Sequence, residues 1–443
     1  MDQGPVVQAD CPRVLLVNYE PINRRYATGI TMGSLFRGWP KDRIAQIYCD
    51  DSEPDTSICD RSWHLDLEDL RMPEWLRAKV VVAMKARRQR HAENQTGIVV
   101  AGRVRNTSSL RNQVFRLAKM AFFRGLEFSS YKVSPELHAW VRSFRPDVIY
   151  SILGDLHLLK LVQELSDDQA IPVVPHFMDD WIVSLHNRGL VERVLKHQLV
   201  TATRRIMRTA PTMMVISRAM AEEYEKRYQY VFVPFMNCID PNGFGSARRH
   251  RYDGETFRFV YAGGLHLGRW QLLLDIGQVL SALTSSGTKA VIDVYAPNIT
   301  DEISAHLSAQ SVIRLCGAVP PDKVKDILAN CDGLLHIESF EESIKHYTRY
   351  SMSTKIPEYL ASGVAIFAYG PENLASIQYI GANNCGVVVE ERNPELLTSR
   401  LQYFIADKGM RARLADNART LCITNHHSLR QREQFRIALT QSR

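Results

Sequence analysis

The chain has 443 residues, of which 45% are hydrophobic and 23% are charged, with a net charge of +7. This apolar content excludes a disordered chain, and the length exceeds what one ordinary core serves, so we expect two domains of roughly 200 residues each. No stretch approaches the ~20 consecutive apolar residues of a membrane-spanning helix. The eight cysteines are scattered without a metal-type spacing, which favours buried thiols in a reducing, cytoplasmic compartment and predicts no metal site.

The first predicted strand covers 13–19, and a helix opens near Gly29. The loop between them, 20–28, lies at the carboxyl end of a strand, where open α/β sheets bind ligands. An ordinary βα turn with Gly29 as a conformational break is the alternative interpretation. A second strand follows at 44–48.

The positive charge is concentrated in one segment. Between 77 and 124 there are twelve Lys or Arg residues and a single acidic residue, Glu93. Two ranges in this segment, 75–90 and 110–124, have helical spacing. Three interpretations stay open: docking on an anionic membrane surface, binding of a phosphate backbone, or a helix that packs on the core with a solvated basic side. The membrane interpretation would use a patch formed by Arg87, Arg88, Arg90, Arg116 and Lys119.

Strands at 147–153 and 171–177 flank a helix at 155–165, and the second of these strands ends in a polar cluster, 176–181. Asp179 and Asp180 are suited to orient a hydroxyl group, and His176 to stabilise developing charge. A structural turn in which Asp180 caps the next helix is an equal alternative. Strands at 212–217 and 230–235 complete this half, and the segment 236–243, rich in turn-forming residues, predicts a linker.

The second half alternates strands and helices regularly, which predicts a parallel, doubly wound sheet. Its first strand, 257–262, ends in Gly263 and Gly264, which let a backbone approach a pyrophosphate closely. Arg269 stands at the start of the next helix. We expect a charged loop at 338–349 that folds over a ligand. Further elements are expected as strands at 291–296, 313–317, 334–337, 364–369 and 386–389, and helices at 301–309, 321–330, 374–380, 394–407 and 410–422.

The segment 351–363 is a polar loop that turns into a short helix. Pro357 fits only the first helical turn, so the helix begins near Ser353 or Thr354. Free N–H groups at a helix start attract phosphate, and Lys355 adds a full positive charge. Glu358 leans back toward the helix start, where its carboxylate can accept two hydrogen bonds from a ribose diol. This predicts a nucleotide-diphosphate site; a capped helix with solvated Lys355 and Glu358 is the alternative.

The sequence from Ser353 to Gly363, ahead of a buried strand, resembles the donor-site helix of GT-B glycosyltransferases, especially the retaining family 4. The resemblance implies that Glu358 holds the ribose of a nucleotide-sugar. In that family a second Glu, eight residues earlier, contacts the donor sugar; here that position is Tyr350. The resemblance further implies a donor site formed by Gly263, Gly264, Tyr350, Ser353, Thr354 and Glu358, catalytic roles for His176, Asp180, Arg269 and Lys355, and an acceptor side with Gly29 and Asp179.

The predicted fold class is therefore α/β with GT-B architecture, in which two Rossmann-like, doubly wound domains face a central cleft. The expected divisions are 13–236 with a basic helical insertion at 73–125, a linker at 237–256, a donor domain at 257–425, and a tail at 426–443 that packs back on the first domain. The last two helices before the tail are also expected to cross back.

The predicted function is transfer of a sugar from a nucleotide-diphosphate donor to a glycan or lipid-linked acceptor, with retention and without metal or cofactor. The resemblance favours an anionic membrane over nucleic acid as the partner of the basic helices, at the cytoplasmic face of the membrane. The alternatives are a GT-B sugar-nucleotide epimerase or hydrolase, and a non-catalytic protein that uses the basic helices at a membrane.

Overall fold

This computed structural model describes residues 11–24, 27–72, 129–185, 189–244, 256–297 and 299–442. The predicted membrane patch (Arg87, Arg88, Arg90, Arg116 and Lys119) lies outside the described residues, as do positions 245–255 of the linker predicted at 237–256.

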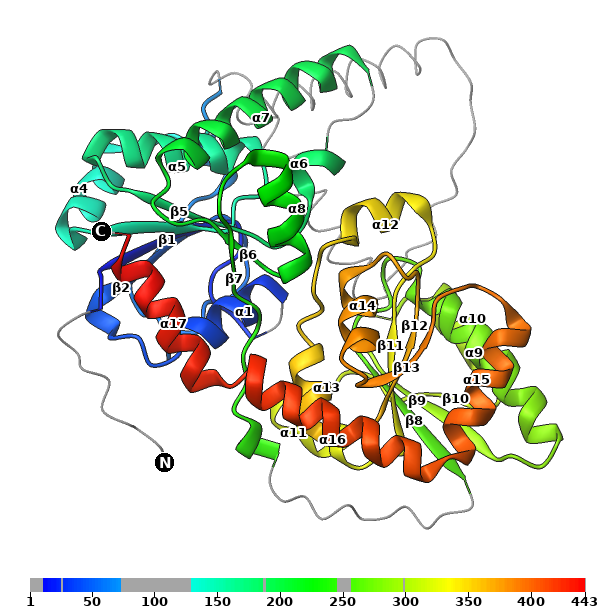
Figure 1. Cartoon of the computed structure of the whole chain (residues 1–443). Helices are drawn as coiled ribbons and strands as arrows, with labels where there is room; N and C mark the ends of the chain where they lie inside the picture. Colours follow the sequence, from blue (N-terminus) through cyan, green and yellow to red (C-terminus); the bar gives the residue numbers. More distant parts are fainter. Residues whose placement is uncertain are drawn as a thin grey trace, which may run out of the picture.

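In the described part of the chain, seven parallel strands form the first sheet (Figure 1). Their order is β3-β2-β1-β4-β5-β6-β7. All five residues of β1 are buried, as expected of a parallel strand that helices cover on both faces. The strands are β1 (Val14–Asn18), β2 (Ile44–Tyr48), β3 (Ser62–His64), β4 (Val148–Ser151), β5 (Val173–Phe177), β6 (Met214–Val215) and β7 (Val233–Pro234).

Helices α1, α4, α5, α6, α7 and α8 surround this sheet. Side chains of Ser134, Asp155 and Ser217 cap α4, α5 and α8 by accepting hydrogen bonds from backbone N–H groups. The sequence analysis missed α4, α7 and α8. The bounds are α1 (Ala27–Phe36), α4 (Pro135–Phe144), α5 (Leu156–Gln169), α6 (Trp181–Ser184), α7 (Leu190–Thr209) and α8 (Arg218–Tyr228).

Within residues 256–297 and 299–442, the second sheet has six parallel strands in the order β10-β9-β8-β11-β12-β13. Both sheets confirm the predicted α/β architecture of doubly wound parallel sheets. The strands are β8 (Phe257–Ala262), β9 (Ala290–Tyr295), β10 (Ile313–Leu315), β11 (Gly333–Ile337), β12 (Ile366–Tyr369) and β13 (Gly386–Val389).

Eight helices of the described residues belong to this half. One of them, α12 (Glu342–Thr348), occupies most of the segment predicted as a charged loop, so that prediction was wrong. The others are α9 (Arg269–Ser285), α10 (Asp301–Ser308), α11 (Pro321–Ala329), α13 (Ile356–Ser362), α14 (Ala375–Ala382), α15 (Pro394–Ala406) and α16 (Lys408–Asn425).

A last helix, α17 (Ser428–Thr440), lies on the first domain. The ring of Phe435 in α17 packs edge-on against Phe36 and Phe235, with ring centroids 5.0 and 5.2 Å apart. The helices α15 and α16, which we expected to cross back as well, stay with the second sheet, where Phe404 stacks on Phe259. Helical periodicity gives the existence of these helices but not the sheet that they cover, which explains the error.

The strand order reverses at two places, between β1 and β4 and between β8 and β11. Open α/β sheets bind their ligands outside the carboxyl ends of the strands at such a switch point. In the second sheet, the residues that leave these carboxyl ends are Gly263 and Glu338.

Candidate functional site

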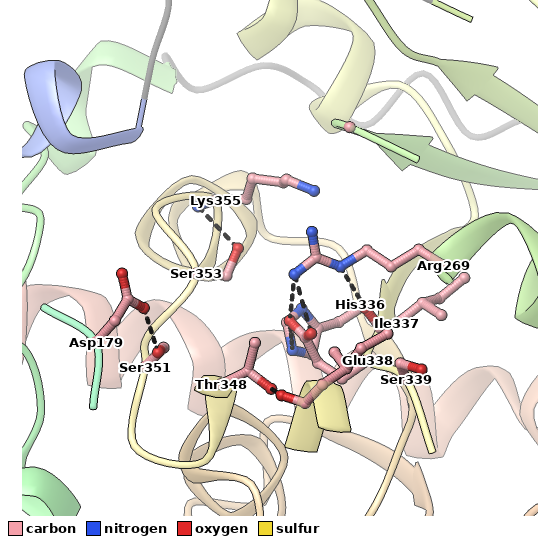
Figure 2. A network of polar contacts seen from close by, with 12 residues as sticks. Asp179, Arg269, His336, Ile337, Glu338, Ser339, Thr348, Ser351, Ser353 and Lys355 are labelled. Carbon is pink, nitrogen blue, oxygen red and sulfur yellow. Dashed lines mark hydrogen bonds and ion pairs between the residues drawn. The ribbon is translucent and has the colours of Figure 1, made fainter. Parts of the chain in front are cut away.

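Three charged side chains meet at the switch point of the second sheet (Figure 2). Arg269, the first residue of α9, donates hydrogen bonds from Nη2 to both carboxylate oxygens of Glu338, at 3.1 and 2.9 Å, and from Nε to the carbonyl of Ile337 at 3.2 Å. Lys355, from the loop that enters α13, lies on the other side of the guanidinium. The arrangement brings together Arg269 and Lys355, the two cations that the sequence analysis assigned to one diphosphate.

Burial and neighbouring charges shift the pKa values of the side chains in this cluster. Loss of hydration lowers the pKa of Lys355 to about 7, with Arg269 adding to the effect and Glu338 and Glu358 opposing it. Burial alone would raise the pKa of Glu338, but the charges of Arg269 and neighbouring groups outweigh it and hold that pKa below its ordinary value. Burial also lowers the pKa of His336, on β11, to about 4, so this imidazole is neutral at physiological pH.

The glycine turn after β8 packs directly against the lysine. Gly263 has φ +147, and a Cβ atom on it would lie 1.8 Å from Nζ of Lys355, so any other residue would displace the amine. The amine sits 4.8 Å from the ring centroid of Tyr261, a cation–π contact. At Gly264, a Cβ atom would lie 2.5 Å from Nδ1 of His266. Both predicted glycines therefore border the cluster.

The helix α13 begins slightly later than we expected. Its first residue is Ile356 and Lys355 occupies the N-cap position, with no side-chain capping bond, so Ser353 and Thr354 do not cap it. The carbonyl of Ser353 accepts from the Ile356 N–H at 3.1 Å, and the carbonyl of Thr354 accepts from Nδ2 of Asn237 at 2.9 Å. These bonds fix the loop in which the two predicted donor-site residues lie.

Glu358 lies in the first turn of α13, as predicted. Burial raises its pKa, while Lys325 of α11 and Lys355 oppose the rise. Lys325 is thus a second cation near this carboxylate, and the sequence analysis missed it because α11 reads only as an amphipathic helix. Its amine would lie 2.6 Å from a Cβ atom placed on Gly243.

Comparison with solved structures identifies the architecture. The chain is similar to Anabaena HepE, solved in complex with UDP, with a TM-score of 0.62 and 12% identity over 97% of this chain and 99% of HepE. The chain has the GT-B fold. A glycosyltransferase from Rickettsia africae (TM-score 0.61, 12% identity, 97% and 98% covered) and WaaG, a glycosyltransferase involved in lipopolysaccharide biosynthesis (0.54, 14%, 96% and 99%), are also similar. No family model and no curated protein matches the sequence.

In the first domain of this GT-B fold, the two predicted catalytic residues are buried and contact internal partners. His176 is fully buried in β5, and its Nδ1 lies 2.6 Å from the Tyr150 hydroxyl. Burial lowers its pKa to about 4. Asp180 is also buried, and its Oδ1 accepts from Arg227 and from the Tyr224 hydroxyl, both at 2.9 Å. Both groups are thus engaged by partners inside the first domain, and their catalytic roles stay predictions.

Asp179 instead joins the two domains. Its carboxylate accepts hydrogen bonds from the hydroxyls of Ser351, at 2.5 Å, and Tyr347, at 3.2 Å. Burial raises its pKa. Tyr350, which we expected at the donor sugar, packs its ring against the core of the first domain, and its carbonyl accepts from the Ser217 hydroxyl at 2.7 Å. The structure does not bring Tyr350 to the Arg269–Lys355 cluster.

Gly29, predicted on the acceptor side, lies inside α1. A Cβ atom there would be 2.2 Å from Nδ2 of Asn23, so the residue allows the β1–α1 loop to pack on the helix. The backbone N–H of Gly29 donates a hydrogen bond to the carboxylate of Glu20. Burial, aided by Asp50, raises the pKa of Glu20 to about 7. Glu20 is thus a candidate that the sequence analysis passed over within a loop that it did single out.

Two classes of site find no support in the described part of the chain. No group of His, Cys, Asp or Glu side chains there is placed to hold a metal ion. None of the helices described is long and apolar enough to cross a membrane.

Proposed function

We propose that this chain is a glycosyltransferase that moves a sugar from a nucleotide-diphosphate donor to an acceptor, with retention and without metal. The observation that carries the proposal is the pair of desolvated cations, Arg269 and Lys355, at a sheet switch point bordered by Gly263. Two desolvated cations beside open backbone form an anion site. The similar HepE was solved with UDP and with UDP-glucose, which supports a nucleotide-sugar as the anion.

The chemistry to be assisted is departure of the diphosphate. The bond between the anomeric carbon and the phosphate oxygen breaks, and its electron pair stays on that oxygen, so negative charge grows there. The acceptor oxygen bonds to the carbon, and the proton of its hydroxyl passes to the released phosphate. Cations fixed in a site of low dielectric stabilise this charge without reorganising. Arg269 and Lys355, together with the backbone N–H groups near Thr354, would provide this stabilisation of the negative charge. Glu358 would accept hydrogen bonds from the ribose hydroxyls.

The acceptor would be a glycan or a lipid-linked glycan precursor, reached at a cytoplasmic membrane surface. The described residues add a feature that favours this: the outward face of α7. Leu190 is 77% exposed and Val194 51%, and the same face continues into exposed arginines. An apolar tip followed by cations suits an anionic bilayer surface. The exposed arginines of α7 are Arg193, Arg204, Arg205 and Arg208.

Incubation with a panel of nucleotide-sugars and a lipid extract as acceptor tests the proposal, with release of nucleoside diphosphate as the readout. Release that requires the acceptor is the expected result. Release without acceptor would favour a sugar-nucleotide hydrolase, and conversion of the sugar an epimerase. Absence of any turnover, with vesicle binding intact, would favour a non-catalytic membrane protein.

A further inference from the structure

We propose that Glu338 is a positioning residue, which holds the guanidinium of Arg269 so that its remaining edge faces the donor's diphosphate. This inference rests on the proposed function and names a residue that the sequence analysis did not place in the site. Glu338 is 5% exposed and follows β11 directly, and its backbone N–H extends the sheet by bonding the carbonyl of Tyr369 at 2.9 Å. Its carboxylate therefore stands on a rigid base.

The bonding pattern of Arg269 leaves one direction open. Nη2 is held by both oxygens of Glu338, and Nε by the carbonyl of Ile337. No described residue accepts a hydrogen bond from the third nitrogen, Nη1, and Figure 2 shows this nitrogen pointing to the side where Lys355 lies. A planar guanidinium held at two nitrogens has a fixed orientation, so its two free N–H groups are aimed in advance.

A carboxylate at this position needs an explanation, because the proposed site binds an anion. A negative charge next to a diphosphate weakens anion binding by direct repulsion. The charge of Glu338 also favours the protonated form of Lys355, but the hydrogen-bond and ion-pair partners of its carboxylate among the described residues are Arg269 and His336, whose Nε2 lies 3.8 Å away and belongs to a neutral ring. The orientation of Arg269 is thus what this carboxylate provides.

A positioning role and a purely electrostatic role of Glu338 predict opposite changes in diphosphate affinity for the variant Glu338→Gln. If Glu338 orients Arg269, Glu338→Gln should weaken the binding of UDP, GDP or ADP, and of inorganic pyrophosphate, by roughly 10- to 100-fold, the value of a charge-assisted hydrogen bond. If the carboxylate only repels anions, the same substitution should tighten binding. Titration calorimetry on the full chain distinguishes these results.

A double-mutant cycle shows whether the effect passes through Arg269. At pH 6, where Lys355 stays protonated, Glu338→Gln introduced into an Arg269→Ala background should change diphosphate affinity less than about 2-fold or tighten it, because no guanidinium remains to be oriented. An equal loss in both backgrounds would overturn the proposal. Asp293→Asn is the matched control, since Asp293 is a buried carboxylate of β9 whose ion-pair partners, Arg258 and Arg314, are outside the proposed donor site. It should leave affinity unchanged.

The pH dependence of diphosphate binding provides a second measurement, which would not change if Glu338 had only a structural role. Binding should weaken as Lys355 loses its proton. Glu338→Gln should shift this loss of affinity to lower pH, since a charge that favours the protonated amine of Lys355 is removed. Arg269→Ala should shift it to higher pH. The groups that face Lys355 are Arg269, Glu338, Glu358, Tyr261, His266 and His336.

The outcomes also separate this inference from the proposed function. Wild-type protein that binds a diphosphate while Glu338→Gln binds it equally well overturns the positioning role and leaves the donor site intact. Wild-type protein that binds neither pyrophosphate nor any of the three nucleotides overturns both. Crystals of Glu338→Gln should show a displaced guanidinium; an unmoved one also contradicts the role of Glu338.

Discussion

Lys355 makes the stability of the unliganded protein depend on pH in a defined window. Its pKa is about 7 in the folded chain and 10.5 in its ordinary state, so between these values the unfolded chain binds one more proton than the folded chain. The free energy of unfolding should therefore rise with pH across this window, by about 1.4 kcal/mol per unit. The full window corresponds to about 5 kcal/mol, an upper bound because water screens the part of Lys355 that stays exposed.

Replacing the amine by a thioether isolates this effect. Lys355→Met should be more stable than wild type below pH 7, where the buried charge is costly, and this advantage should shrink steadily as pH approaches 10. Urea unfolding of both proteins from pH 6 to 9.5 measures the difference. A difference that stays constant across this range would show that Lys355 titrates alike in the folded and unfolded chain, and would refute the assignment of a desolvated amine to the site.

The same proton governs ligand binding. A diphosphate favours the charged amine, so nucleoside diphosphate affinity should fall up to tenfold per unit as pH rises above 7 in wild type. Lys355→Met should bind weakly at every pH and show no such slope. A wild-type affinity that is flat from pH 6 to 9 would mean that the lysine does not contact the phosphates.

Three other changes test the remaining assignments. Glu358→Ala should weaken donor binding by about 1.5–3 kcal/mol without lowering the melting temperature, as measured by calorimetry; an unchanged affinity removes Glu358 from the site. Tyr350→Glu, which introduces the residue of the family that the sequence resembles, should lower stability by about 1–3 kcal/mol and leave transfer no faster, because the ring packs against the first domain's core; a faster variant would contradict this. Charge reversal of three arginines should release the protein from anionic vesicles, by about 1 kcal/mol per charge, while vesicle binding equal to wild type would refute the membrane patch. Those arginines are Arg87, Arg88 and Arg90.

The second sheet was readable from sequence because each of its strands is a short apolar run between turn formers. The strand predicted at 257–262 matches β8, and 386–389 matches β13. The start of α13 was located within a few residues because Pro357 restricts it. In contrast, β6 and β7 have only two residues each, and local pattern alone overestimated their length.

The chemistry of individual polar residues was less predictable. A carboxylate or imidazole after a strand reads alike whether it faces a ligand or a buried partner. The difference for Asp180 lies in Arg227, 47 residues away, and for His176 in Tyr150, 26 residues away. Glu338 likewise gains its meaning from Arg269, which lies 69 residues earlier. Such pairings follow from strand order, and a single sequence does not encode strand order locally.

The departure at Tyr350 becomes intelligible once the domain contact is considered. The segment from Tyr347 to Lys355 is bonded to the first domain through Asp179 and Ser217, and it ends at the lysine of the donor cluster. A carboxylate at position 350 would have to leave this contact to reach a sugar. In this chain Tyr350 binds the segment to the first domain. It lies only five positions from Lys355, whose amine would contact the diphosphate. Any relative movement of the domains should therefore be transmitted to Lys355.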